Sequence, residues 1–248
     1  MRNRGLLGAG IALAMALGGV QAHAQFFGPY PPGAFYLGPE GGWTKLQSQT
    51  NTLTIRNGRG TESVSHSVTG NFDSGFNAGV RAGYMWGPWR FEEEYSYRFN
   101  SLSSLSPLGG YVQGNTHSNA IMTNALFDFT LGWPITPHIG GGVGAVNVDT
   151  GASTTSTIAV PTGPTTGVLV SPRISANRWE FGYQGIAGIR YLINPALALD
   201  IDYRYFATPS FTTTQYRLAP VHGACCYSAS FSSRVQSQNV VASITMLF

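Results

Sequence analysis

The chain has 248 residues, and charged residues make up 10% of them, whereas a soluble domain typically carries about 25%. Its formal net charge of +3 provides no strong field for nucleic acid or an anionic surface, so we expect no nucleic-acid partner. Beyond residue 24, no apolar stretch approaches the ~20 residues that a membrane helix needs. Low charge without a spanning helix favours an exported all-β protein.

Residues 1–24 have the three parts of a secretory signal peptide. Arg2 and Arg4 precede an apolar run, and Ala22-His23-Ala24 is a small-x-small cleavage site. The alternative is an N-terminal membrane anchor, but the run is short and rich in glycine. We predict cleavage after Ala24, which removes two of the 14 basic residues and leaves 12 against 11 acidic ones.

Eight later segments are predicted to be β-strands, and the connections between them alternate in length. Turn-forming links join the second and third, the fourth and fifth, and the sixth and seventh; Gly87-Pro88 and Asn194-Pro195 are two of them. The other four connections are long, rich in Ser, Thr, Gly, Asn and Pro, and lack the residues for a core. In chain order, the predicted strands are 35–46, 75–86, 89–100, 119–132, 138–148, 179–193, 197–206 and 235–248.

Short turns on one side and long loops on the other are typical of outer-membrane barrels. Each segment is about long enough to cross a bilayer at a tilt. The predicted fold is therefore all-β: an eight-stranded antiparallel up-and-down transmembrane β-barrel over 35–248, preceded by an irregular periplasmic leader at 25–34. A soluble lipocalin-like barrel has a similar strand plan, but its apolar face points inward.

The residue types decide which face looks outward. In the segment LALDIDYRYF, Leu197, Ile201 and Tyr203 share one face, whereas Asp200 and Arg204 lie on the other. Large aromatic residues from every strand would overfill a narrow eight-stranded barrel, whereas small and charged residues fit inside it. The aromatic face is therefore predicted to contact lipid.

The opposite faces form a predicted interior polar network, with Glu40 as a further candidate. Because buried charges must be paired, the network is expected to be structural; the alternative is that it lines a small water-filled pore. Its predicted members are Arg81, Arg90, Glu92, Glu94, Arg98, Asp128, Glu180, Arg190, Asp200, Asp202 and Arg204.

All five tryptophans lie at strand ends, which predicts two aromatic girdles at the membrane interfaces. They are Trp43, Trp86, Trp89, Trp133 and Trp179. Glu93 breaks the pattern, because the alternation of its strand turns it to the lipid; a β-bulge that shifts the register is the alternative.

Several stretches resemble the small opacity-type and OmpA-like outer-membrane barrel family: VRAGYMW followed by WRFEEEYSYRFN, IGGGVGAVNV, LALDIDYRY and the closing VVASITMLF. The resemblance covers essentially the whole chain from about residue 35. It implies residence in the outer membrane among lipid and lipopolysaccharide, and we expect the barrel to be a monomer. It also implies a C-terminal strand read by the barrel-assembly machinery through Phe248, Met246, Ile244 and Val240. Because the chain stops at the barrel, no periplasmic peptidoglycan-binding domain is expected.

Other candidate sites are weak. Some barrels of this size deacylate lipid A through a His-x-Ser-Asn run, but in Thr116-His117-Ser118-Asn119 the His and Ser are adjacent and would face opposite sides of a strand. His66, His138 and His222 are expected in loops and turns without metal-ligand spacing, so no metal or cofactor is expected. The glycines of 140–144 indicate close packing or curvature. The adjacent Cys225 and Cys226 are compatible with a vicinal disulfide, an intermolecular bridge or free thiols.

The sequence thus predicts a non-enzymatic outer-membrane barrel with a structural or surface role and weak passive porin activity. Adhesion through the long loops is the alternative. A lipid A-modifying enzyme is the hypothesis that the sequence supports least.

Overall fold

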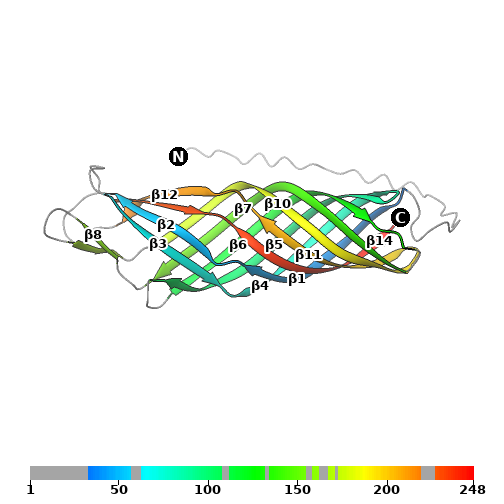
Figure 1. The fold of residues 1–248 in the computed structure, drawn as a ribbon, viewed down its shortest axis with the longest axis horizontal. Coiled ribbons are helices and arrows are strands. Elements are labelled where there is room, and N and C mark those ends of the chain that lie inside the picture. Colours follow the sequence, from blue (N-terminus) through cyan, green and yellow to red (C-terminus); the bar gives the residue numbers. More distant parts are fainter. Residues whose placement is uncertain are drawn as a thin grey trace, which may run out of the picture.

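The computed structural model describes residues 33–56, 63–107, 112–131, 134–154, 158–161, 167–170, 173–218 and 227–248. All regular structure within these ranges is β-strand (Figure 1). The predicted signal peptide, the cleavage after Ala24 and residues 25–32 of the predicted leader lie outside the described residues and stay predictions. A search of the described residues found no helix long and apolar enough to cross a membrane.

Eight antiparallel strands close into a barrel, because β1 pairs on one side with β4 and on the other with the last strand, β14. From β1, the order around the barrel is β4, β5, β6, β7, β10, β11 and β14. The predicted eight-stranded antiparallel barrel is therefore confirmed. The bounds are Phe35–Leu46 (β1), Ser74–Trp86 (β4), Trp89–Ser106 (β5), Val112–Asp128 (β6), Ile135–Thr154 (β7), Arg173–Asn194 (β10), Leu197–Ala207 (β11) and Gln236–Leu247 (β14).

The two ends of the barrel differ. At one end, here the turn end, the strands are joined by short links, and Gly87 adopts a φ of 58° that other residues rarely take. The chain terminus lies at this end, where Phe35 N donates to Phe248 O and Phe248 N donates to Phe35 O, both at 2.9 Å. The C-terminal strand is therefore held to its last residue. The opposite end is here the loop end.

At the loop end, the prediction of long loops without regular structure is wrong for much of their length. Two hairpins continue the barrel wall, and β5, β6, β7 and β10 have 18, 17, 20 and 22 residues, although about 9–11 suffice to cross a bilayer. The Ser- and Thr-rich composition is used in cross-strand side-chain contacts rather than in a core, such as Thr50 Oγ1 with Thr69 Oγ1 at 2.9 Å. The added strands are Gln49–Arg56 (β2), Ser63–Phe72 (β3), Phe211–Leu218 (β12) and Tyr227–Ser233 (β13), with a small separate hairpin of Ile158–Pro161 (β8) and Gly167–Val170 (β9).

The faces alternate as the sequence predicts. On β11, Ile201 and Tyr203 are exposed, whereas Asp200, Asp202 and Arg204 are buried in the barrel. The outward face carries the large aromatic and aliphatic side chains of every barrel strand, from Phe35 to Phe248. This face is the lipid face of the barrel.

Two inward glycines of β1 allow the barrel to close. A Cβ built on Gly42 would lie 1.9 Å from the carbonyl oxygen of Val240 on β14, and one on Gly38 would lie 1.9 Å from that of Ile244. These carbonyls belong to the backbone of the closing strand, so the neighbour could not move aside without disturbing the ladder. By contrast, a Cβ on Gly41 has Asn77 O as its nearest neighbour, at an ordinary 3.6 Å.

Replacing Gly42 with alanine is therefore expected to lower the free energy of unfolding by about 1–3 kcal/mol, as other overpacked sites do. Gly41→Ala, one residue along the same strand, is the matched control and should leave the stability nearly unchanged. Urea unfolding of the refolded barrel, followed by heat-modifiable gel mobility, measures both. Equal losses in the two variants would contradict the close approach of β1 and β14.

Candidate functional site

The interior of the barrel is filled in three layers along its axis. An apolar cluster lies nearest the turn end, a charged layer occupies the middle, and a second apolar cluster, here the plug, lies toward the loop end. The turn-end cluster is Ala34, Tyr36, Met85, Ala198 and Leu247. The plug is Leu46, Ala120, Met122, Val146, Val148, Phe206 and Val235, with Phe72 and Phe211 packed against it.

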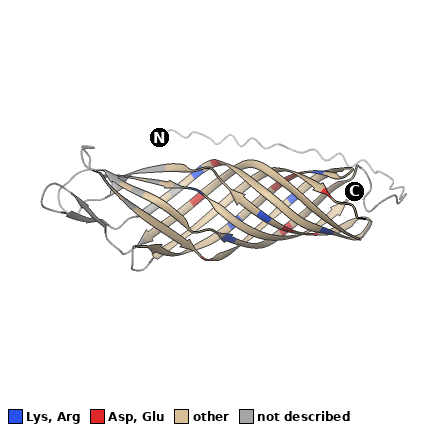
Figure 2. Ribbon diagram, viewed as in Figure 1, with Lys and Arg blue, Asp and Glu red and all other residues tan. Residues whose placement is uncertain are grey.

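Five guanidinium groups and six carboxylates form the charged layer, and all of them are buried. Figure 2 shows most charged positions in the part of the barrel nearer the C terminus, on strands all around the wall. His138 is buried in the same layer. The charged members are Arg81, Arg90, Arg98, Arg190, Arg204, Glu40, Glu92, Glu94, Asp128, Asp200 and Asp202.

Arg204 and Arg81 hold the centre of the layer. Arg204 Nη2 lies 3.1 Å from Glu40 Oε2 and 2.9 Å from Asp202 Oδ2, while its Nη1 lies 2.8 Å from Glu94 Oε2. Arg81 Nη2 contacts the same two acids, at 2.7 Å for Glu40 and 2.9 Å for Asp202. Since these side chains come from β1, β4, β5 and β11, the ion pairs join strands on different sides of the barrel.

Asp200 organises the part of the layer nearer the turn end. Arg190 donates to both of its oxygens, at 2.7 and 3.0 Å, and Arg90 Nη1 lies 3.3 Å away. Arg90 Nε also pairs with Asp128 at 2.9 Å. The planar guanidinium group can bridge two carboxylates in this way, which an ammonium group does less well. This agrees with a chain whose only lysine, Lys45, lies outside the layer.

An arginine stacked on an aromatic ring marks each boundary of the charged layer. Arg190 lies 5.0 Å from the ring centroid of Tyr36 in the turn-end cluster, and Arg98 lies 4.4 Å from that of Phe206 in the plug. Cation–π contacts of this kind let a charge meet an apolar layer without a carboxylate partner on that side. Arg98 is also 3.6 Å from Glu94.

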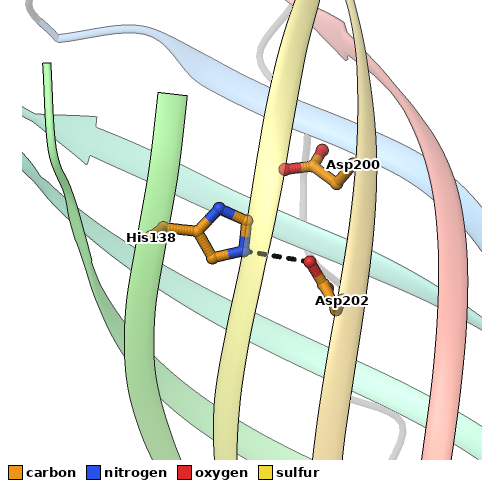
Figure 3. A group of neighbouring side chains, drawn as sticks. All are labelled: His138, Asp200 and Asp202. Atoms are coloured by element: carbon orange, nitrogen blue, oxygen red, sulfur yellow. Dashed lines mark hydrogen bonds and ion pairs between the residues drawn. The ribbon is translucent and has the colours of Figure 1, made fainter. Parts of the chain in front are cut away.

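His138 corrects the sequence-based expectation that the histidines lie in loops and turns. It lies in β7 and reaches past β10 to Asp202 on β11, with 2.9 Å between Nε2 and Oδ1 (Figure 3). Gly188 on β10 makes room for this contact, because a Cβ there would lie 2.7 Å from His138 Nε2. His66 lies in β3, while His222 lies outside the described residues.

His138, Asp200 and Asp202 together offer three ligand atoms within 4.8 Å of one another, an arrangement that their sequence spacing did not suggest. The two carboxylates are nevertheless occupied by arginines: Asp200 by Arg190 and Arg90, and Asp202 by Arg81 and Arg204. A divalent cation would add two positive charges beside these guanidinium groups. The donor set therefore fits an ion-pair network better than a metal.

The other predicted site residues lie elsewhere. Glu180 is only half-buried and pairs at 3.6 Å with Arg178, whose side chain is 47% exposed, so it lies apart from the fully buried charges. Glu93 faces the lipid and accepts a hydrogen bond from Thr123 Oγ1 at 2.8 Å. The ladders on both sides of Glu93 run without a register shift, so no bulge turns it inward.

His117 and Ser118 lie on opposite faces of β6. Tyr97 Oη is hydrogen-bonded to His117 Nδ1 at 2.5 Å on the outer face, whereas Ser118 is buried inside. The pair therefore lacks the contact that a base and a nucleophile require.

The structure places four of the predicted girdle tryptophans on the outer face. Trp86 and Trp89 are register partners at the turn end, and Trp43 and Trp179 lie toward the loop end. Trp133, Cys225 and Cys226 lie outside the described residues. The C-terminal residues Val240, Ile244, Met246 and Phe248 all face outward.

Residues 10–219 match the family model described as the outer membrane protein beta-barrel domain, so the chain belongs to this family. Over 84 residues, it is 36% identical to uncharacterised proteins of Brucella abortus (strain 2308) and Brucella suis biovar 1 (strain 1330). The match covers 34% of this chain and 28% of the length of each relative.

Among solved structures, the outer membrane protein OprG from Pseudomonas aeruginosa is similar with a TM-score of 0.53 and 11% identity, over 88% of this chain and 97% of that one. Neisserial surface protein A gives a TM-score of 0.43 and 17% identity, over 87% and 99%. At these identities, the likeness concerns the fold alone. Family and fold together define an outer-membrane β-barrel protein.

Removing one partner from the charged layer should destabilise the barrel strongly. Arg81→Met would leave Glu40 and Asp202 buried with fewer partners, and we expect a loss of about 3–5 kcal/mol in the free energy of unfolding. The control is Arg234→Met, because Arg234 is exposed and donates from Nη2 to the side chain of the nearby Gln236, at 3.0 Å. Urea unfolding followed by tryptophan fluorescence measures both variants, and similar losses would contradict the role of the buried pairs.

Proposed function

We propose that this protein is a closed, non-conducting outer-membrane barrel that acts through the wall it presents at its loop end. The observation that supports this proposal most is the filling of the interior. The charged layer is paired across the barrel, and apolar clusters cover it on both sides. An ion that crossed the barrel would have to displace buried ion pairs and then pass the plug, where no charge can solvate it.

The long wall supports a surface role. In outer-membrane barrels, short turns lie in the periplasm and long loops outside, which orients the loop end to the cell exterior. There the hairpins β2–β3 and β12–β13 pair with each other through β13 and β2, so the outer wall is a continuous sheet over much of the circumference. Thr54 and Ser65 bond across it at 3.0 Å, as do Thr116 and Thr150 at 3.2 Å. A firm polar wall of this kind suits contact with another surface better than passage of solutes.

The remaining roles follow from the same faces. We infer that outer-membrane lipid and lipopolysaccharide are the partners of the aromatic face, and that a single copy suffices because the barrel closes on itself. The separation of His117 from Ser118 supports a non-enzymatic role. A signal peptide that ends near Ala24 would bring the chain to this membrane.

Conductance separates this function from a porin. The full mature chain, refolded and inserted into a planar lipid bilayer, should give no unitary current steps. A variant with Phe206→Ala and Met122→Ala in the plug, and Arg98→Ala at its boundary, should conduct more often, because the apolar barrier and its adjacent charge are removed. Regular current steps from the unaltered protein, with folding checked by heat-modifiable mobility, would overturn the proposal and favour the porin.

We also propose that the C-terminal residues Phe248, Met246, Ile244 and Val240 form the signal for the barrel-assembly machinery. Their outward positions on a fully paired terminal strand support this, since all four side chains are exposed on the outer face. Deleting Phe248 should lower the amount of folded protein in the outer membrane of cells. Refolding of the same variant in detergent should be nearly normal, and an equal defect in both assays would point to stability instead.

A further inference from the structure

The barrel wall has a seam at its loop end. β10 pairs with β7 from Arg173 onward, but its ladder with β11 reaches only to Tyr183, which pairs with Ala207. Within the described residues, β12 pairs with β13 alone and forms the edge of the sheet. The stretch 173–182 of β10 therefore lies beside β12 without a backbone ladder between the two strands. This boundary is here called the seam.

The residues after β11 explain the seam. Thr208 turns toward the neighbouring segment: its N donates to Val235 O at 2.9 Å, and Val235 N donates to Thr208 Oγ1 at 3.1 Å. Pro209 follows and has no N–H to continue a ladder with β10. When pairing resumes, Phe211 lies opposite Ser233 of β13. β12 thus follows β13 and leaves β10.

The seam begins at the height of the outer membrane interface. Trp179 and Phe181 lie on the part of β10 that borders the seam. Both face outward, and they are 63% and 54% exposed. Tryptophan at a strand end marks the level of the lipid headgroups. Lipid of the outer leaflet can therefore lie against the lower part of the seam.

The side chain of Arg178 bridges the seam. Arg178 of β10 donates from Nη1 to the carbonyl oxygen of Thr212 on β12, at 2.7 Å. Its side chain is 47% exposed, and Glu180 lies 3.6 Å from its Nε. An exposed side-chain contact of this kind holds two strands less firmly than a backbone ladder does.

Behind this part of the wall, directly above the plug, lies a cavity of about 40 Å³, here the chamber. Its walls come from β2, β3, β5, β6, β7 and β12, and its apolar side chains include Phe72, Leu102, Leu105, Phe211 and Val235. The volume exceeds the ~10–15 Å³ that a cavity needs to hold one water molecule, but is well below the ~150 Å³ of an apolar cavity that binds benzene. It suits the narrow end of a chain better than a ring.

We propose that the chamber binds the end of one aliphatic chain, which enters through the seam. Burial of an apolar chain end against these side chains is favourable. Phe211, which lines the chamber, belongs to β12, the strand that borders the seam. The plug and the charged layer close the barrel below the chamber, so the chain is held there and does not pass. This proposal does not depend on the surface role of the outer wall.

Photolabelling of the full mature chain in lipid nanodiscs tests the proposal. One arm uses a phospholipid with a diazirine at the end of one acyl chain; the other uses a free fatty acid with the same terminal diazirine. After irradiation, mass spectrometry should find label on chamber residues such as Phe211 and Leu102, besides the lipid face. Label from the phospholipid arm identifies a membrane lipid as the source, and label from the free acid alone identifies a free chain.

Variants make the result decisive. Leu105→Trp fills the chamber and should abolish the label there while the lipid-face label stays. Ile201→Trp, on the lipid face of β11, is the matched control and should leave the chamber label intact. Arg178→Ala removes the bridge to Thr212 and should raise the chamber label several-fold. Each variant is first checked for folding by heat-modifiable mobility.

Three results would overturn the proposal. The first is label confined to the lipid face in both arms, and the second is chamber label that survives Leu105→Trp. The third is chamber label unchanged or lowered by Arg178→Ala, which would exclude the seam as the entrance.

Discussion

Arg204 contacts Glu40, Glu94 and Asp202 from a side chain that is almost completely buried, and six of the eight barrel strands contribute charged side chains to the same layer. An eight-stranded barrel has a bore just wide enough for its own side chains. Charges placed there lose their hydration and can be kept only if each meets an opposite charge. The network therefore constrains which residues face inward on all strands at once, and through the period of two it fixes the outward face as well.

The same constraint explains the two apolar layers. Charges end where Tyr36 and Phe206 meet Arg190 and Arg98 through their rings. Beyond Phe206, the bore no longer has to satisfy charge, so the plug and then the chamber can form from apolar side chains. The loss of pairing between β10 and β12 occurs only above this level, where the network no longer joins the strands. Closure below and a seam above are thus two consequences of where the ion pairs stop.

Much of the barrel could be predicted from the sequence because alternation and turn chemistry are local signals. The face of β11 follows directly from LALDIDYRYF, and the turn at Gly87-Pro88 from its residue types. The continuation of the strands beyond the membrane could not be predicted in this way. The Ser- and Thr-rich stretches have no apolar alternation, and their order comes from cross-strand partners such as Thr50 and Thr69.

The pairing of side chains within the charged layer could likewise not be predicted from the sequence. His138 lies 64 positions from Asp202, and only the order β7–β10–β11, with Gly188 between them, brings the two together. For Glu180, the sequence predicts the inward face correctly but not the position along the barrel axis. The side chain lies beside Arg178 instead of in the charged layer. Phase can be read from alternation, whereas height and pairing depend on the register of the whole sheet.

The most direct measurement of whether the interior is sealed is hydrogen exchange at the arginine side chains. In ¹⁵N-labelled protein in lipid bilayers transferred to D₂O, the Nε–H protons of Arg81 and Arg190, which donate to Glu40 and Asp200, should exchange far more slowly than that of the exposed Arg234. Exchange of the three at similar rates would show that water reaches the charged layer freely and would contradict a barrel closed by its ion pairs.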